Sequence, residues 1–354
     1  MSGETQNISA MAEKISSDLF KWFKWELVGP TNENFQCMKK DQHKTLAGTH
    51  PTDVVFSYKD PYLNRTIFLN TDLKSYIKGS ITATKMRNAL VSLANSIDCA
   101  QGCKEWKERY SYKSGASEVR GMLFVYNHDG DFDQSFYDVF YQSHNTETDK
   151  KKRGINLDNI PVRAGQKIHI IEPRTINYLQ SIICDLSQLS HKREFPLGKK
   201  YQFFYPDLSL HKVSGSPEEL PATVELLTGP FLIIKHNDVR HCNEETSQWE
   251  TTFKHGYIIY YNGEGKNELE FIYILDTLSK YQLLDGNENI RIRIVNPNIH
   301  KDVRSIFMSA KDSYCQEWGF DEHKKTIIDA IDFQQVEFTK PRFSSVEIGW
   351  ERQA

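Results

Sequence analysis

Two acidic side chains and one lysine stand in strand-like sequence, where charge is unusual. In HPTDVVFSYKDPYLNRTIFLNTDLKSY, residues 50–76, Asp53 opens one apolar run, and Asp72 and Lys74 fall late in the next. The intervening KDPYLNR has turn chemistry, so the two runs predict a hairpin of antiparallel strands. A charge inside a sheet costs free energy unless it is paired or serves a site. These three residues are therefore the first candidates for chemistry.

The register of the hairpin predicts which charges meet. With the turn centred between Tyr62 and Leu63, Asp53 lies opposite Asp72, and Lys74 follows on the same face. Like charges placed so are destabilising. A divalent cation between the carboxylates would offset this, because Mg²⁺ takes oxygen ligands and commonly combines one or two carboxylates with water and substrate phosphate. Such a site can activate a water against a phosphodiester, with Lys74 orienting the water or stabilising negative charge.

The tripeptide Asp/Glu-x-Lys alone is a weak signal. It occurs five times, starting at Asp72, Glu105, Asp149, Glu264 and Glu322. Only the first lies late in an apolar strand that follows another strand bearing an acid. Two other interpretations stay open: Asp53 could cap backbone groups at a turn, and Asp72 with Lys74 could form an ion pair on an exposed edge strand.

The elements that must position these residues follow from hydrophobic periodicity. An apolar stripe predicts a first helix over residues 11–28, followed by a short strand over 34–38. The hairpin strands are expected over 52–58 and 66–76, a second helix over 82–98 and an apolar strand over 121–127. The resulting order is α, β, β, β, α, β. KIHIIEP and TINYLQSIICDLSQL predict one more strand and helix that extend the same sheet.

The length of 354 residues predicts two domains. The boundary is placed in HKREFPLGKK, which gives domains 1–194 and 195–354. The second is predicted to be α+β: FLIIKH, GYIIYYNGEGKNELEFIYIL and NIRIRIV predict strands, with a hairpin turn at 262–266. A helix is expected over 300–318, and QQVEFT and SSVEIGW predict two last strands. No motif there names a reaction, so partner binding or regulation is the default expectation.

Composition limits the cellular setting. The formal net charge is −3, so the chain is not a polycation, although a local basic groove would suffice for nucleic acid. No apolar run approaches the ~20 residues of a membrane-spanning helix, and the N-terminus lacks the apolar core of a secretory signal. A cytoplasmic protein without membrane contact is expected. The six cysteines include no C-x-x-C pair, which favours free buried thiols over a zinc site.

The hairpin and the order of elements resemble the PD-(D/E)XK superfamily of restriction-endonuclease-like nucleases. Its pattern is an acid at the start of one strand and Asp/Glu-x-Lys on the next. Here Pro51-Thr52-Asp53 stands for the first part, with one residue inserted, and Asp72-Leu73-Lys74 for the second. The resemblance covers roughly residues 10–130 and implies an α/β fold: a restriction-endonuclease-like αβββαβ core with a mixed sheet, followed by an α+β C-terminal domain.

The same resemblance implies a nuclease dependent on Mg²⁺ (or Mn²⁺). Asp53, Asp72 and the backbone carbonyl of Leu73 would bind the metal, and Lys74 would position the attacking water.

Further residues are expected around this centre. Many such nucleases add a glutamate from the first helix, for which Glu13 is the candidate and Glu26 the rival. Lys85 and Arg87, in the first turns of the second helix, would contact nucleic acid, with a solvated helix face as the alternative. His50, just before Pro51, is expected to be a loop histidine in solvent.

More loosely, LFKWFKWELVGP and LNTDLKSY resemble nuclease subunits of two-gene bacterial systems that defend against phage. This implies a protein partner subunit and a toxic activity that is silent until infection. DNA is the expected substrate, although the sequence holds no feature that decides between DNA and RNA. An RNA nuclease, for instance one acting on transfer RNA, and a catalytically silent nucleic-acid-binding scaffold stay open as alternatives. Whether the chain forms a homo-oligomer is also open.

Overall fold

The computed structural model describes residues 3–45, 47–111, 115–141, 154–198, 200–206, 219–242 and 247–339. The chain separates into two compact units, one extending to Asn177 and the other spanning Tyr178–Thr339. The division lies inside helix α5 (Pro173–His191), N-terminal to the predicted boundary at residues 194 and 195. The predicted strand over 344–350 lies outside the described residues.

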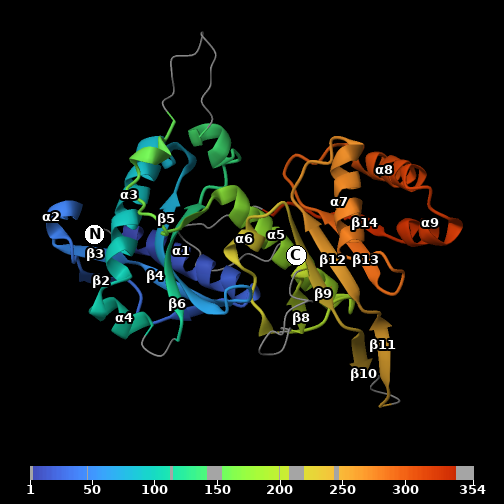
Figure 1. Cartoon of the computed structure of the whole chain (residues 1–354), viewed down its shortest axis with the longest axis horizontal. Helices are drawn as coiled ribbons and strands as arrows, with labels where there is room; N and C mark the ends of the chain where they lie inside the picture. The colour runs from blue at the N-terminus through green and yellow to red at the C-terminus, as the bar shows by residue number, and fades with distance from the viewer. Residues whose placement is uncertain are drawn as a thin grey trace, which may run out of the picture. The chain divides into compact units, whose positions relative to one another are not determined.

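The first unit is built on a five-stranded mixed sheet with the strand order β1-β4-β5-β6-β7 (Figure 1). The bounds of these strands are Glu26–Val28, Val54–Asp60, Arg65–Tyr76, Ser117–Asn127 and Ile168–Ile171. The pairs β1–β4 and β4–β5 are antiparallel, whereas β5–β6 and β6–β7 are parallel. Strand β5, which carries two of the candidate residues, is therefore the central strand of the sheet.

The hairpin of β4 and β5 has the predicted register. Val54 pairs with Thr71, and Val55 pairs with Asn70. In the connecting turn, Asp60 Oδ1 accepts hydrogen bonds from the N–H groups of residues 62 and 63, each at 2.9 Å. Asn64 adopts a left-handed φ of 48°. These turn contacts fix the length of the connection and with it the register.

Helices cover both faces of this sheet. Helix α1 (Gly3–Trp22) covers one face, where Phe20 packs edge-on against Phe56 of β4 and Phe124 of β6. Helix α3 (Ala83–Ala100) covers the other, and Leu93 joins Leu123 of β6 in its core. Helix α4 (Lys104–Tyr110) follows α3 directly. The sequence α1, β1, β4, β5, α3, β6 is the αβββαβ core expected of a PD-(D/E)XK fold.

A small two-stranded sheet interrupts this core between β1 and β4. It pairs β2 (Glu33–Gln36) with β3 (Thr49–Thr52), and the short helix α2 (Lys40–His43) lies between them in sequence. The strand predicted over 34–38 is thus β2, which belongs to this small sheet and not to the main one. Short helical turns elsewhere are Lys78–Ser80, Tyr137–Tyr141 and Leu157–Asn159.

The first helix ends earlier than the apolar stripe predicts. The carbonyl of Phe20 accepts hydrogen bonds from the N–H groups of Phe23 and Trp25, at 3.0 and 3.1 Å. Lys24 adopts a left-handed φ of 63°, which ends a right-handed helix. Glu26 then begins β1, antiparallel to β4. The prediction of helix through residue 28 was wrong because hydrophobic residues continue from the helix into the edge strand.

The second unit contains a five-stranded sheet with the order β14-β13-β12-β9-β8 (Figure 1). These strands span Asp332–Gln335, Asn289–Ile294, Gly256–Tyr261, Phe231–His236 and Tyr201–Phe203. Besides most of α5, its described helices are α6 (Val224–Leu227), α7 (Glu268–Lys280), α8 (Val303–Glu317) and α9 (Glu322–Asp329). A separate hairpin joins β10 (Val239–Cys242) to β11 (Trp249–Phe253). Among the helices that the structure describes, none combines the length and hydrophobicity needed to span a bilayer.

Helix α7 replaces a strand that the sequence predicted. The side chain of Asn267 accepts a hydrogen bond from the N–H of Glu270 and caps the helix. Phe271, Ile274 and Leu278 are buried on one side of it, a spacing that only a helix produces. The predicted hairpin at 262–266 is therefore the turn between β12 and α7. The β-branched and aromatic residues of ELEFIYIL caused the error.

Candidate active site

Asp72 and Lys74 lie side by side on the central strand β5. Their neighbours on β6 are Leu123 and Val125, which belong to the core beneath α3, so both charged side chains are on the α3 face. Lys74 Nζ donates a hydrogen bond to Asp72 Oδ1. The side chain of Lys74 is only 28% exposed and that of Asp72 only 19% exposed. Pairing with β4 ends at Thr71, whereas β6 pairs with β5 as far as Tyr76. The low exposure of the two side chains, and not strands on both sides, therefore argues against an ion pair on an exposed edge strand.

Asp53 reaches the same place from the bend between β3 and β4. Its Oδ2 accepts a hydrogen bond from the backbone N–H of Leu73 at 2.7 Å. Asp53 does cap a backbone group, as the alternative interpretation held, but that group belongs to the Asp-Leu-Lys tripeptide. The structure thus brings Asp53, Asp72 and Lys74 together from two neighbouring extended segments.

Burial and like charge make Asp72 hard to ionise. Burial is the main factor that raises the pKa of Asp72 to about 6, and the nearby Asp53 contributes, while Lys74 opposes the shift without overcoming it. Burial also works against the charge of Lys74, yet the contact with Asp72 holds the pKa of Lys74 above its ordinary value. The lysine is therefore a cation at neutral pH, and the two carboxylates form a site where a hard cation would relieve repulsion.

A buried asparagine fixes the strand that carries this pair. Asn70 Oδ1 accepts hydrogen bonds from Thr52 Oγ1 at 2.9 Å and from Trp106 Nε1 at 3.1 Å. Asn70 Nδ2 donates to Ser96 Oγ at 3.0 Å. One side chain, 1% exposed, therefore ties together β3, β5, α3 and α4. The sequence analysis missed it, although a polar residue inside the apolar run TIFLNT, on the same face as Asp72, was a usable signal.

Glu13 is linked to Asp53 through one residue. Asn32 Nδ2 donates a hydrogen bond to Glu13 Oε2 at 3.2 Å, and the backbone N–H of Asn32 donates to the Asp53 carbonyl at 2.7 Å. The rival, Glu26, is an exposed residue of β1 opposite Ser57, several residues along β4 from the bend. Position therefore favours Glu13, whose part in the site stays a prediction.

Of the two basic residues predicted to contact nucleic acid, Lys85 contacts the strand that carries Asp72 and Lys74. Its Nζ lies 5.0 Å from the centre of the Tyr76 ring, and Tyr76 follows Lys74 on the same face of β5. Burial raises the pKa of Tyr76; the nearby Lys74 opposes this shift and Asp72 adds to it. Arg87 is an exposed residue of α3. Contact of either residue with nucleic acid stays a prediction.

His50 was expected in solvent, and the structure corrects this. Its side chain is buried, at 2% exposure, and its Nε2 lies 3.2 Å from His43 Nδ1. It sits on β3 beside Cys37, His43 and Cys99, away from the paired acids. The expectation of buried thiols is correct for Cys37, Cys99, Cys103 and Cys315, whereas Cys184 is exposed and Cys242 half-buried.

Comparison with known proteins bears on the first unit. Residues 1–175 match the family model described as "GAPS4 protein PD-(D/E)XK nuclease domain". No curated protein and no solved structure matches the chain. The match covers the whole αβββαβ core together with Asp53, Asp72 and Lys74, and it ends close to the boundary between the two compact units.

Proposed function

Residues 1–175 of this chain belong to the PD-(D/E)XK nuclease superfamily, and from this premise we propose that the protein is a divalent-metal-dependent nuclease that hydrolyses DNA. The observation that carries the proposal is the convergence of Asp53, Asp72 and Lys74 on the central strand and the bend beside it. A silent scaffold is disfavoured, because a scaffold has no need of two half-buried acids and a lysine in this arrangement.

The donor set suits a hard cation. Asp53, Asp72 and the carbonyl of Leu73 offer only oxygen atoms, which Mg²⁺ and Mn²⁺ prefer. When bound, such an ion supplies an activated water and stabilises negative charge on the phosphate. Lys74 is held as a cation by the carboxylates around it. It therefore donates a hydrogen bond to the water or to a phosphate oxygen, and it is poorly suited to removing a proton.

Residues around this centre would assist in holding the substrate and metal. Lys85, in the first turn of α3, is exposed beside Tyr76 and would neutralise a phosphate, as would Arg87, which is also exposed two residues further along the helix. Glu13 would add a third carboxylate, since Asn32 already holds it close to the Asp53 backbone.

We further propose a role in defence against phage, in the cytoplasm and together with a protein partner. The support is that the matching family is associated with anti-phage defence and that the chain extends well beyond the nuclease unit. The second unit, which contains no recognised motif, is the proposed site for the partner or for regulation. Cleavage of RNA and not of DNA would change the proposed substrate but leave the proposed site unchanged.

A cleavage assay tests the proposal. The purified full chain, with and without the product of the neighbouring gene, is incubated with DNA and with total RNA in Mg²⁺. We expect DNA degradation, and we expect Asp72→Ala and Lys74→Ala each to lower the rate at least about a hundredfold, because each removes a group that acts on the reacting phosphate.

Lys266→Ala is the matched control. Lys266 forms an ion pair with Glu264 in another Glu-x-Lys tripeptide, on the exposed turn before α7, so its loss removes a similar pair outside the site. Unchanged cleavage in this variant is expected. Full activity in both Asp72→Ala and Lys74→Ala would reject the site, and binding of DNA without cleavage under all conditions would favour the scaffold.

A further inference from the structure

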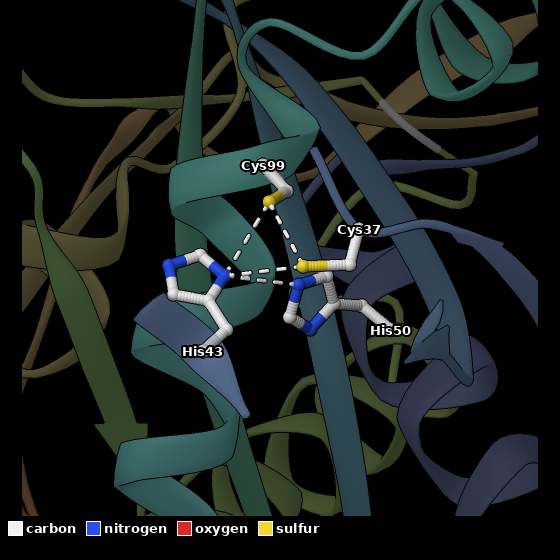
Figure 2. Close-up of side chains that lie close together, drawn as sticks. All are labelled: Cys37, His43, His50 and Cys99. Atoms are coloured by element: carbon white, nitrogen blue, oxygen red, sulfur yellow. Dashed lines mark hydrogen bonds between the residues drawn. The ribbon is translucent and has the colours of Figure 1, made fainter. Parts of the chain in front are cut away.

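We propose that Cys37, His43, His50 and Cys99 bind a structural zinc ion. Figure 2 shows the four side chains pointing toward one another, from the segment after β2, from α2, from β3 and from α3. One ligand atom of each lies within 4.8 Å of the corresponding atoms of the other three. Two thiols and two imidazoles are a common ligand set of structural zinc. Mg²⁺ and Mn²⁺, the metals proposed for the nuclease site, prefer oxygen ligands and would bind this set poorly.

The distances fit a tetrahedral ion. With Zn–S near 2.3 Å and Zn–N near 2.0–2.1 Å, a tetrahedron separates two sulfurs by about 3.8 Å, a sulfur and a nitrogen by about 3.5 Å, and two nitrogens by about 3.3 Å. The Sγ atoms of Cys37 and Cys99 are 3.8 Å apart. His43 Nδ1 lies 3.5 Å from each Sγ and 3.2 Å from His50 Nε2. Four of the six ligand-to-ligand distances thus agree with one tetrahedral centre, and those from His50 Nε2 to the two sulfurs are within 4.8 Å.

A carboxylate behind His43 supports the assignment independently. His43 presents Nδ1 to the cluster, and its Nε2 lies 3.1 Å from Asp98 Oδ2. Histidines that bind zinc commonly donate their second ring N–H to a carboxylate, which orients the ring and strengthens the ligand. Asp98 is held in turn by Lys39 Nζ at 2.8 Å and by Arg163 Nε at 2.9 Å. A carboxylate anchored this way is well placed for that role.

The site is closed, which points to structure and not to catalysis. Cys37, His50 and Cys99 are 4%, 2% and 0% exposed, and the His43 side chain is 5% exposed. Four protein ligands leave no position for substrate.

The ion would join segments of the unit that lie far apart in the sequence. Cys37 follows β2, His43 ends α2, and His50 lies on β3, whereas Cys99 is near the end of α3. Three residues after His50 comes Asp53, one of the two candidate catalytic acids. Zinc would therefore hold the β2–β3 segment against α3 and so set the position of Asp53. This structural role does not depend on the proposed nuclease activity.

Metal analysis of the full chain tests the assignment. Elemental mass spectrometry of the protein, purified without chelators, should find about one zinc per chain. Cobalt substituted for zinc should give the thiolate charge-transfer and ligand-field bands of a tetrahedral S₂N₂ site, a readout that needs no variant and no activity. Cys37→Ser and Cys99→Ser should retain less than a tenth of the metal.

Two further variants separate loss of a ligand from loss of the fold. Cys103→Ser replaces another buried cysteine of the same hydrophobic cluster and should keep its zinc. Asp98→Asn keeps all four ligands and should weaken zinc affinity about 10- to 100-fold, measured by competition with a chelating dye. Absence of zinc that added zinc does not restore, iron in its place, a Cys37–Cys99 disulfide in the isolated chain, or equal metal loss in Cys103→Ser would each overturn the assignment.

Discussion

Asp72 is a site residue whose acidity its surroundings change strongly. Its carboxyl group is buried next to Asp53, and Lys74 only partly compensates, so the pKa of Asp72 rises to about 6. A carboxylate with this pKa is half protonated in mildly acidic solution. Protons and a divalent cation therefore compete for the same oxygen atoms over an accessible range of pH.

This competition predicts a pH-dependent stabilisation by Mg²⁺. At about pH 8 Asp72 is ionised, whereas at about pH 5 only around a tenth of it is, so apparent Mg²⁺ affinity should fall about tenfold. We expect added Mg²⁺ to raise the melting temperature more at the higher pH, as measured by thermal denaturation without chelator. Asp72→Asn should remove the Mg²⁺ effect at both pH values. An equal shift at both pH values in the unmodified chain would contradict this role of Asp72.

At this scale the sequence revealed the catalytic candidates but not the zinc ligands. Asp53, Asp72 and Lys74 lie in one hairpin, so strand alternation and turn chemistry were enough to bring them together. Three of the proposed zinc ligands are also close in sequence, but Cys99 comes from α3, and only the packing of that helix against β3 completes the set. Five residues separate Cys37 from His43, and six separate His43 from His50. This spacing matches no recognised zinc motif.

Among the elements, β5 depends on the hydrogen bonds of Asn70. We expect Asn70→Ala to lower the free energy of unfolding by about 2–3 kcal/mol, because Trp106 Nε1 and Thr52 Oγ1 lose their acceptor in a buried place. Urea unfolding of the full chain measures the change. Asn88→Ala is the control, since Asn88 is exposed on the same helix that Asn70 contacts and its replacement should be nearly neutral. Equal effects of the two variants would show that the Asn70 contacts do not stabilise β5.

Elements were predictable where local signals agreed and failed where they conflicted. The β4–β5 register was correct because the turn contacts of Asp60 and the alternation of the strands gave the same answer. The strand assigned to ELEFIYIL was wrong because its aromatic and β-branched residues outweighed the Asn267 cap and the helical spacing. The end of α1 was misplaced because the stripe of apolar residues runs on into β1, and a left-handed Lys24 is not visible in the sequence.

At the scale of the whole molecule, the two compact units should respond separately to acid. In the second unit, His236 is 1% exposed; its Nδ1 donates to the Asn237 carbonyl at 2.9 Å, and its Nε2 accepts from Arg291 Nη2 at 2.7 Å. Burial, with a contribution from Arg291, lowers the pKa of His236 to about 4. As pH falls from about 6.5 to about 4, His236 takes up a proton in the unfolded chain but not in the folded one. The free energy of unfolding therefore falls, by up to about 3 kcal/mol.

We therefore expect His236→Gln to lose less stability than the unmodified chain between about pH 7 and about pH 5. Hydrogen exchange, corrected for intrinsic rates, should show the difference in β9 and β12 and leave β5 unaffected, because the first unit has its own core. His323→Gln, an exposed position on α9, serves as the control. The same acid sensitivity in all three proteins would mean that His236 does not govern the acid response.

The parallel pairing of β5 with β6 sets a condition on when this protein can become active during its synthesis. All of Asp72-Leu73-Lys74 pairs with Leu123-Phe124-Val125, so the intervening residues and β6 must be synthesised before that pairing can form. When the ribosome has just synthesised β5, the nascent chain therefore contains every candidate catalytic group but lacks β6, the strand that pairs with Asp72-Leu73-Lys74. On the proposed nuclease function, cleavage would thus begin only after translation has passed well beyond the reactive residues, a delay in which the proposed partner could bind.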